Sequence, residues 1–174
     1  MNDRKLLNSE LGRLSAEQYA LKDDSGIVVV LDNVRSAYNV GSAFRSADAF
    51  GVDKIWLCGI CAVPPSQQIH KTALGAELSL PWDHCDDTPA LLRRLRSEGY
   101  TVVCVEQTLN SVSLPQFRRD AGKKYALVFG NEVDGVQQEA VDEADFCLEI
   151  PQQGTKHSLN VSVSVGVVLW HFQL

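Results

Sequence analysis

A run of five consecutive apolar residues near the start of the chain constrains the fold most. Residues 27–31 read Ile-Val-Val-Val-Leu, without the polar alternation of a strand that has one face in water. Such a run is typical of a strand buried on both faces, as in a parallel sheet covered by helices. Further strands are predicted at 54–57, 100–105, 124–129 and 146–150, and helices at 40–50, 86–98 and 136–143. This alternation predicts an α/β fold with a parallel sheet flanked by helices.

The two ends of the chain leave alternatives open. Residues 8–22 are predicted to form a short helix, with Ser15 and Gln18 at capping-box spacing as a second possible start. Residues 159–165 alternate apolar and polar as in a strand, whereas Ser158, Ser162 and Gly166 would lie on one face of a helix. Periodicity alone favours the strand by a small margin. We expect a short N-terminal helical extension at 1–25 and one domain at 26–174.

Length and composition indicate an ordinary globular domain. The chain has 174 residues, of which 45% are hydrophobic and 22% are charged, and these values are common among soluble proteins. No apolar run is long enough to cross a membrane, and no signal-peptide core follows the first residues. The five cysteines are therefore expected to be reduced thiols in the cytoplasm. Cys58 and Cys61 have zinc-knuckle spacing, but no second pair of this kind exists, so we expect no metal.

The charge of the chain is unevenly distributed. The formal net charge is −6, which argues against a general nucleic-acid binder. Residues 132–149 hold seven acidic side chains and no Lys or Arg, so the remainder has 16 basic and 15 acidic residues. Binding of RNA would then need a local basic surface, for which the candidates are residues 4–5, 93–96, 118–119 and 123–124.

Three polar blocks stand out against the apolar elements. Asn39 to Arg45 lies on the first predicted helix of the domain, Gly130 to Gly135 forms a predicted tight turn after a strand, and Ile150 to Asn160 follows another strand. Ligands bind beyond the carboxyl ends of strands in open α/β sheets, so the last two loops are expected to line one crevice. The turn lacks the G-x-G-x-x-G spacing and the Walker lysine of common nucleotide-binding loops.

Together, these blocks resemble the SpoU (TrmH-like) family of the SPOUT class, which comprises RNA 2′-O-ribose methyltransferases. The resemblance covers about residue 27 to the end of the chain. The family blocks N-x-G-x-x-x-R, G-x-E-x-x-G and S-L-N match, in this order, Asn39, Gly41 and Arg45, then Gly130, Glu132 and Gly135, then Ser158, Leu159 and Asn160.

The resemblance implies a SPOUT-type fold with a C-terminal deep trefoil knot, a helix at the C-terminus and a homodimer. We expect this helix to form part of the dimer contact, because Trp170 and Phe172 are too apolar for an exposed terminus. The implied reaction moves a methyl group from S-adenosylmethionine to a ribose 2′-hydroxyl of tRNA or rRNA, without a metal.

The resemblance also implies roles for particular residues. Cofactor contacts are expected at Gly130, Ile150 and Leu159, largely through backbone atoms, and at Thr108 in the loop after a predicted strand. Catalytic roles are expected for Arg45, Asn39, Glu132, Ser158 and Asn160. The start of the helix at 39–41, beside Arg45, is expected to hold an RNA phosphate.

Other interpretations of these residues stay open. Arg45 also fits a surface position on an amphipathic helix, Glu132 a solvated turn, and His157 a solvated loop. The chain could be a non-catalytic RNA-binding relative, or a nucleotide-binding α/β protein outside the family. Only about 25 residues precede the first strand, so we expect no separate N-terminal RNA-binding domain.

Overall fold

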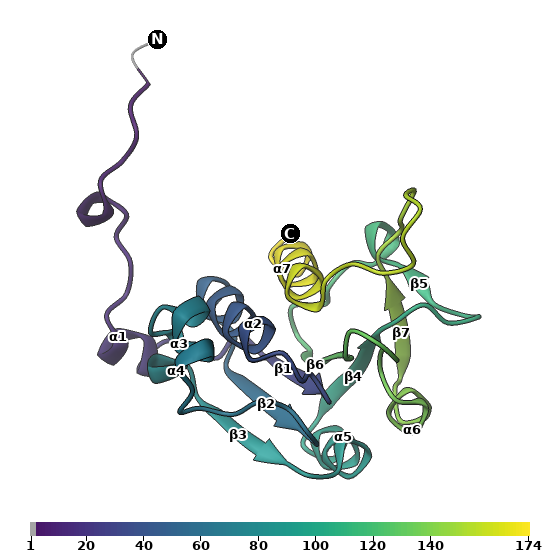
Figure 1. The fold of residues 1–174 in the computed structure, drawn as a ribbon. Coiled ribbons are helices and arrows are strands. Elements are labelled where there is room, and N and C mark those ends of the chain that lie inside the picture. Colours follow the sequence, from purple (N-terminus) through teal and green to yellow (C-terminus); the bar gives the residue numbers. More distant parts are fainter. Residues whose placement is uncertain (1–2) are drawn as a thin grey trace.

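The apolar run at 27–31 forms β1 (Ile27–Asp32), which lies inside a seven-stranded sheet (Figure 1). The computed structural model describes residues 3–174. Its strand order is β3-β2-β1-β6-β4-β7-β5, and every neighbouring pair is parallel. The predicted parallel α/β class is confirmed.

The other strands are β2 (Lys54–Cys58), β3 (Trp82–Cys85), β4 (Tyr100–Val105), β5 (Val112–Ser113), β6 (Lys124–Phe129) and β7 (Phe146–Glu149). The helices are α1 (Ala16–Ala20), α2 (Ala37–Ala49), α3 (Gln67–Ala73), α4 (Ala76–Ser79), α5 (Thr88–Ser97), α6 (Gln138–Asp142) and α7 (Val161–His171), with 3₁₀ turns at Asn8–Glu10 and Leu114–Gln116. In the part of the chain that is described, no helix combines the length and apolar character that a bilayer crossing requires.

Helices cover both faces of the sheet, which explains the unbroken apolar run in β1. Ile27, Val29 and Leu31 pack into the core beneath α2, α3 and α7, whereas Val28 and Val30 pack into the core beneath α5 and α6 (Figure 1). Successive side chains of a strand point to opposite faces, so both sets must be apolar. Burying each such side chain contributes about 1.5–3 kcal/mol.

The C-terminal segment is a helix, so the helix that the family resemblance implies is confirmed and the strand favoured by periodicity alone is wrong. In α7 the buried side chains are Val161, Val165, Val168 and Leu169, which lie on one helical face that packs towards α2. Val163, which continues the strand-like alternation, is instead half exposed. Tertiary packing against α2 therefore decided between the two periods.

The predicted single helix at 8–22 is also wrong. A 3₁₀ turn at Asn8–Glu10 is separated from α1 by Gly12, whose φ of 59° is left-handed. The capping box is confirmed as the true start: the Ser15 hydroxyl accepts a hydrogen bond from the Gln18 amide, and the Gln18 side chain accepts one from the Ser15 amide. α1 is anchored to the domain by buried Tyr19, whose hydroxyl donates to the Val52 carbonyl at 2.8 Å.

Several elements between residues 66 and 113 were not predicted. The first of them is α3, which Ser66 caps by accepting a hydrogen bond from the Ile69 amide. β3 is an edge strand with the half-polar sequence Trp-Asp-His-Cys, and the two-residue β5 is too short to show a period. Such segments are assigned by pairing with a neighbour rather than by their own pattern.

Candidate functional site

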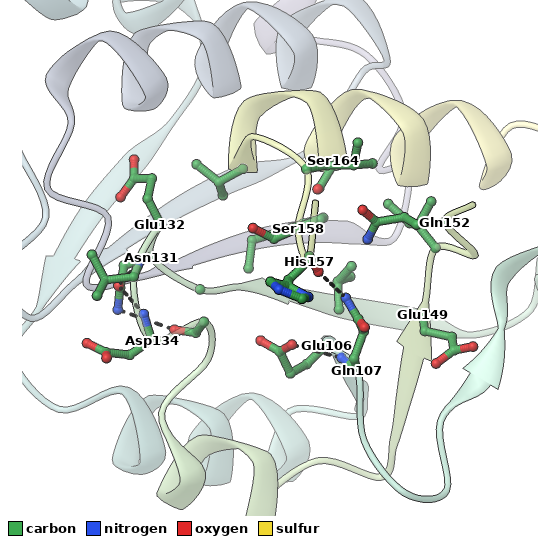
Figure 2. Close-up of a pocket in the computed structure, with 18 of the residues that line it drawn as sticks. Glu106, Gln107, Asn131, Glu132, Asp134, Glu149, Gln152, His157, Ser158 and Ser164 are labelled. Atoms are coloured by element: carbon green, nitrogen blue, oxygen red, sulfur yellow. Dashed lines mark hydrogen bonds between the residues drawn. The ribbon is translucent and has the colours of Figure 1, made fainter. Parts of the chain in front are cut away.

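The loops that follow β6 and β7 line one pocket, together with the residues that follow β4 (Figure 2). The predicted crevice between the loops after residues 129 and 150 is confirmed. Its volume is about 280 Å³, near the lower end for small-molecule sites. The Gln107 side-chain amide donates to the His157 carbonyl at 2.8 Å and ties the loop after β4 to the loop after β7.

The turn after β6 has a geometry that only glycine permits at two positions. A Cβ atom on Gly130 would lie 1.9 Å from the Gly135 carbonyl carbon and 2.1 Å from the Val136 nitrogen. Gly135 has a left-handed φ of 71°. The Asn131 side-chain oxygen accepts hydrogen bonds from the amides of Val133 and Asp134, which closes the turn. The predicted tight turn is therefore confirmed, and its backbone forms one wall of the pocket.

The pocket is lined with negative charge. Its lining residues include four carboxylates and no Lys or Arg: Glu106, Glu132, Asp134 and Glu149. The Glu106 carboxylate is held in place, because it accepts from the Val136 amide at 3.0 Å and from the Gln107 amide at 2.8 Å. Such a lining favours a ligand with positive charge and disfavours one that carries phosphates.

Side chains from all three sequence blocks meet at the rim of the pocket. The Asn39 side-chain amide on α2 donates to the Glu132 carboxylate, and its oxygen accepts from the Asn160 amide at 3.1 Å. Asn160 also caps α7, since its oxygen accepts from the Ser162 amide at 2.9 Å. Glu132 lies 93 positions after Asn39 and Asn160 lies 121 positions after it. Only the fold therefore brings the three residues together.

Most of the other predicted site residues lie in or beside the pocket. Gly130, Ile150, Ser158 and Leu159 line it. Thr108 does not line it, although Glu106 and Gln107 of the same loop do. The Thr108 side chain instead lies beside Cys147, where burial raises the pKa of the thiol and a hydrogen bond from Thr108 partly offsets that effect.

Arg45 lies apart from the pocket. It is exposed on α2, six residues beyond Asn39, and it lines a separate groove formed with α1, α3 and α4. Six residues of helix correspond to a rise of about 9 Å and a rotation of about 240°. Arg45 and Asn39 therefore project from different faces of the same helix.

The helix start expected at 39–41 lies earlier, because α2 begins at Ala37, and phosphate binding by residues 39–41 stays a prediction. Its cap is Ser36, whose hydroxyl accepts from the Asn39 amide at 3.3 Å. Gly41 is buried in the contact between α2 and α3, and a Cβ there would lie 2.2 Å from the Thr72 hydroxyl and 2.3 Å from the Ile69 carbonyl oxygen. Glycine is thus required at this position by helix packing.

The sequence did not single out the acidic lining as a group. Glu106 lies in the loop for which only Thr108 was predicted to contact the cofactor, while Asp134 and Glu149 belong to the acidic stretch at 132–149. The sequence feature that could have revealed the acidic lining is the position of Glu106 and Glu149, which both lie where a predicted strand ends. The carboxyl ends of parallel strands meet at the same edge of the sheet.

Several of the predicted basic clusters are engaged within the chain. Arg93 and Arg96 form ion pairs with Glu143 at 2.7 and 3.4 Å, and Arg4 pairs with Glu10 at 2.6 Å. Arg119 donates to the carbonyls of Phe172 and Ser25. These guanidinium groups stabilise local structure and are less available to a polyanion.

The cysteine pair at 58 and 61 is part of the core. The Cys61 sulfur accepts from the Val34 amide at 3.1 Å and donates to the Leu31 carbonyl at 3.2 Å. Burial raises the pKa of Cys61 to about 11, so the thiol stays protonated at neutral pH. Within residues 3–174, no group of three or more potential ligands is arranged to hold a metal ion.

Comparison with known proteins agrees with this geometry. Residues 26–170 match the model of the SpoU rRNA Methylase family. The chain is 33% identical over 153 residues to the tRNA (guanosine(18)-2′-O)-methyltransferase TARBP1 of Mus musculus, a match that covers 87% of this chain and 10% of that protein. It is also 33% identical over 151 residues to the 23S rRNA (guanosine-2′-O-)-methyltransferase RlmB of Nitrosomonas europaea, covering 84% of this chain and 55% of that one.

Solved structures show the same fold. An AdoMet-bound rRNA methyltransferase from Sinorhizobium meliloti superposes with a TM-score of 0.79 at 30% identity, covering 87% of this chain and 57% of that chain. The TrmH/SpoU tRNA modifying enzyme from A. aeolicus superposes with a TM-score of 0.77 at 29% identity, covering 87% and 76%. The family blocks, the parallel sheet and the matched residues agree: this chain belongs to the SpoU rRNA methylase family.

Proposed function

We propose that the protein is an RNA 2′-O-ribose methyltransferase that uses S-adenosylmethionine and acts on tRNA or rRNA. The observation that carries this proposal is the hydrogen-bonded contact of Asn39, Glu132 and Asn160 at the rim of an acidic pocket. Relatives named as 2′-O-methyltransferases of tRNA and rRNA support it, as does a similar structure described as AdoMet-bound.

The pocket suits this cofactor by charge. S-adenosylmethionine carries a sulfonium, an ammonium and one carboxylate, so its net charge is +1, and the pocket offers four carboxylates. ATP and NAD would bring phosphates towards these carboxylates, which disfavours the alternative of a general nucleotide-binding protein. We assign Gly130, Ile150 and Leu159 to the walls around the adenosine. When bound, the cofactor supplies an activated methyl group.

The catalytic step needs a way to raise the reactivity of a ribose 2′-hydroxyl. We assign this role to Arg45, whose guanidinium remains protonated and can hold the adjacent phosphate and stabilise negative charge on the 2′-oxygen. The phosphate or solvent would then take the proton. Asn39, Glu132, Ser158 and Asn160 would orient the ribose beside the pocket.

We further propose a homodimer, because the pocket and Arg45 are separated within one chain. α7 carries an exposed apolar stripe at Val163, Val167 and Trp170, with exposed fractions of 50, 37 and 59%, and Leu174, just beyond the helix, is 83% exposed. This spacing forms one helical face, which a second copy would cover. The expected contact through Phe172 is wrong, since Phe172 is 1% exposed and stacks on Phe117 within its own chain. A dimer would let Arg45 of one copy serve the pocket of the other.

The dimer has a direct test by complementation. Arg45→Ala leaves the pocket intact, and Gly130→Ala leaves Arg45 intact. If Arg45 acts across the dimer, a mixture of the two inactive variants regains methyl transfer, because one mixed site is complete. If Arg45 acts within its own chain, the mixture stays inactive and the proposed arrangement is wrong.

We also propose that the C-terminal segment forms the deep trefoil knot of SPOUT proteins. The support is the path of the chain, which runs from β7 through the pocket loop into α7. α7 then packs on α2, which follows β1, although β6 and β4 separate β7 from β1 in the sheet (Figure 1). If the backbone of residues 124–171 does not pass through a loop of the chain, the proposed knot is wrong.

Calorimetry and methyl transfer together test the function. We expect S-adenosylmethionine to bind with a micromolar dissociation constant, about −8 kcal/mol. Incubation with a pool of unmodified tRNA and rRNA transcripts should yield 2′-O-methylated nucleosides by mass spectrometry. Absence of heat with the cofactor or its demethylated product contradicts the proposal. Binding of RNA without methylation would instead favour a non-catalytic relative.

A further inference from the structure

A second groove lies between the N-terminal segment and helices α2, α3 and α4. Its volume is about 660 Å³, more than twice that of the pocket. The lining comes from residues 12–15 of the N-terminal segment, from α2 and from the turn between α3 and α4. Figure 1 shows α1 beside α3 and α4, with the preceding segment leading away from the domain. The N-terminal segment therefore forms one wall of a concave surface.

The charge of this groove is opposite to that of the pocket. Arg13 and Arg45 both line it, and among the described residues neither guanidinium takes part in a hydrogen bond or an ion pair. Lys22 also lines the groove, but its ammonium pairs with Asp53 at 2.8 Å. The one lining carboxylate, Asp48, accepts from the Ser79 hydroxyl at 3.2 Å. Two guanidinium groups are thus available to a ligand.

The groove also has exposed apolar side chains along its edge, and its N-terminal wall is anchored to the domain. Leu74 and Leu78 are 66 and 81% exposed along its edge, where a ribose or base could cover them. Tyr19 anchors the N-terminal segment through its bond to Val52. Arg13 is six residues from this anchor, so the segment that carries it is attached to the domain body.

We propose that this groove binds the phosphate backbone of the RNA substrate, with Arg13 and Arg45 as the cationic contacts to the phosphates. Arginine is suited to this task because its planar fork bonds two phosphate oxygens at once. The inference rests on the proposed function and adds Arg13 as a positioning residue for the RNA. On this account, the short N-terminal segment is part of the substrate site, while the acidic pocket excludes the backbone phosphates.

Arg13→Glu tests the proposal, with Arg94→Glu as a matched control. Arg94 is an exposed arginine on α5, on the opposite face of the sheet. Filter binding would use labelled pools of unmodified tRNA and rRNA transcripts at several salt concentrations. We expect Arg13→Glu to weaken binding more than tenfold, and Arg13→Ala to reduce the salt slope by about one. Arg94→Glu should change binding less than threefold.

The outcomes separate this inference from the proposed function. Affinity for S-adenosylmethionine should be unchanged in Arg13→Glu, which shows that the domain remains folded, and Arg13→Lys should recover part of the RNA binding. If the wild type methylates RNA but Arg13→Glu matches it in RNA affinity and salt slope, the groove is not the RNA site. If the wild type neither binds nor methylates any transcript, the proposed function itself is wrong.

Discussion

The acidic pocket and the basic groove both adjoin helix α2, which reaches the pocket rim through Asn39 and lines the groove through Arg45, but they differ in almost every physical respect. The pocket is built from turns at the carboxyl ends of strands, and its lining carries four carboxylates without a Lys or Arg. The groove is built from helix surfaces and the N-terminal segment, and it carries Arg13 and Arg45. The proposed reaction, between a cationic cofactor and a polyanionic substrate, would use two such surfaces. The contrast shows that one small domain carries two surfaces of opposite charge.

The largest effect is expected from a substitution that distorts the backbone of the acidic pocket and leaves its four carboxylates in place. Gly130→Ala places a Cβ within about 2 Å of the backbone at Gly135 and Val136, so the turn must move. We expect loss of S-adenosylmethionine binding by more than 10²-fold in calorimetry, together with a lower melting temperature. Gly154→Ala is the control in the neighbouring loop, because nothing lies within 4 Å of its Cβ position. Normal cofactor binding by Gly130→Ala would show that the turn is not part of the site.

Removing Arg45 tests whether the groove takes part in the reaction. Arg45→Ala should reduce single-turnover methyl transfer by about 10²-fold, since a donor that stabilises developing oxygen charge is lost. Cofactor affinity should stay unchanged, because Arg45 does not line the pocket. Arg45→Lys should restore little, because lysine lacks the planar fork. A wild-type rate for Arg45→Ala would show that Arg45 is an ordinary surface residue of α2 without a role in the reaction.

Neutralising one carboxylate tests whether the negative charge of the pocket contributes to cofactor binding. Glu132→Gln keeps an oxygen that can accept from Asn39 but removes one charge from the pocket. We expect roughly tenfold weaker binding of S-adenosylmethionine and a smaller change for its neutral product, since only the former carries the sulfonium. Glu139→Gln on α6 is the control, as Glu139 does not line the pocket. Equal losses for both ligands would indicate a structural effect.

The smallest expected effect concerns Lys22, which lines the groove but is already paired with Asp53. Lys22→Ala should leave RNA binding within about twofold and lower the free energy of unfolding by about 1 kcal/mol. Burial alone would raise the pKa of Asp53, but its bonds to Lys22 and Ser25 together hold that pKa below its usual value. The stabilisation is therefore complete above the unfolded pKa, near 4, and is lost as pH falls through the folded one.

Urea denaturation of the wild type and Lys22→Ala at pH 7 and pH 3 measures this. The difference between the two proteins should shrink at the lower pH. A strong loss of RNA binding in Lys22→Ala would mean that three cations, rather than two, serve the groove.

The class of fold and the polar blocks of the site could be predicted from the amino-acid sequence. Five adjacent apolar residues at 27–31 favour a strand that is buried on both faces of a sheet, and the turn after residue 129 needs glycine at 135, where φ is left-handed. Both properties are local, because they follow from side-chain period and backbone freedom. The same is true of the capping box at Ser15, which was read correctly even though the helix around it was predicted too long.

How these parts combine depends on contacts between distant segments of the chain. Residues 159–165 satisfy both a strand and a helix period, and burial of Val161, Val165 and Val168 next to α2 selected the helix. Gly41 is required by a contact with α3, a helix that the sequence did not reveal. The contact of Asn39 with Glu132 and Asn160, and the separation of Arg45 from the pocket, depend on which face of α2 meets which loop. Such relations join residues about 100 positions apart, so no local pattern contains them.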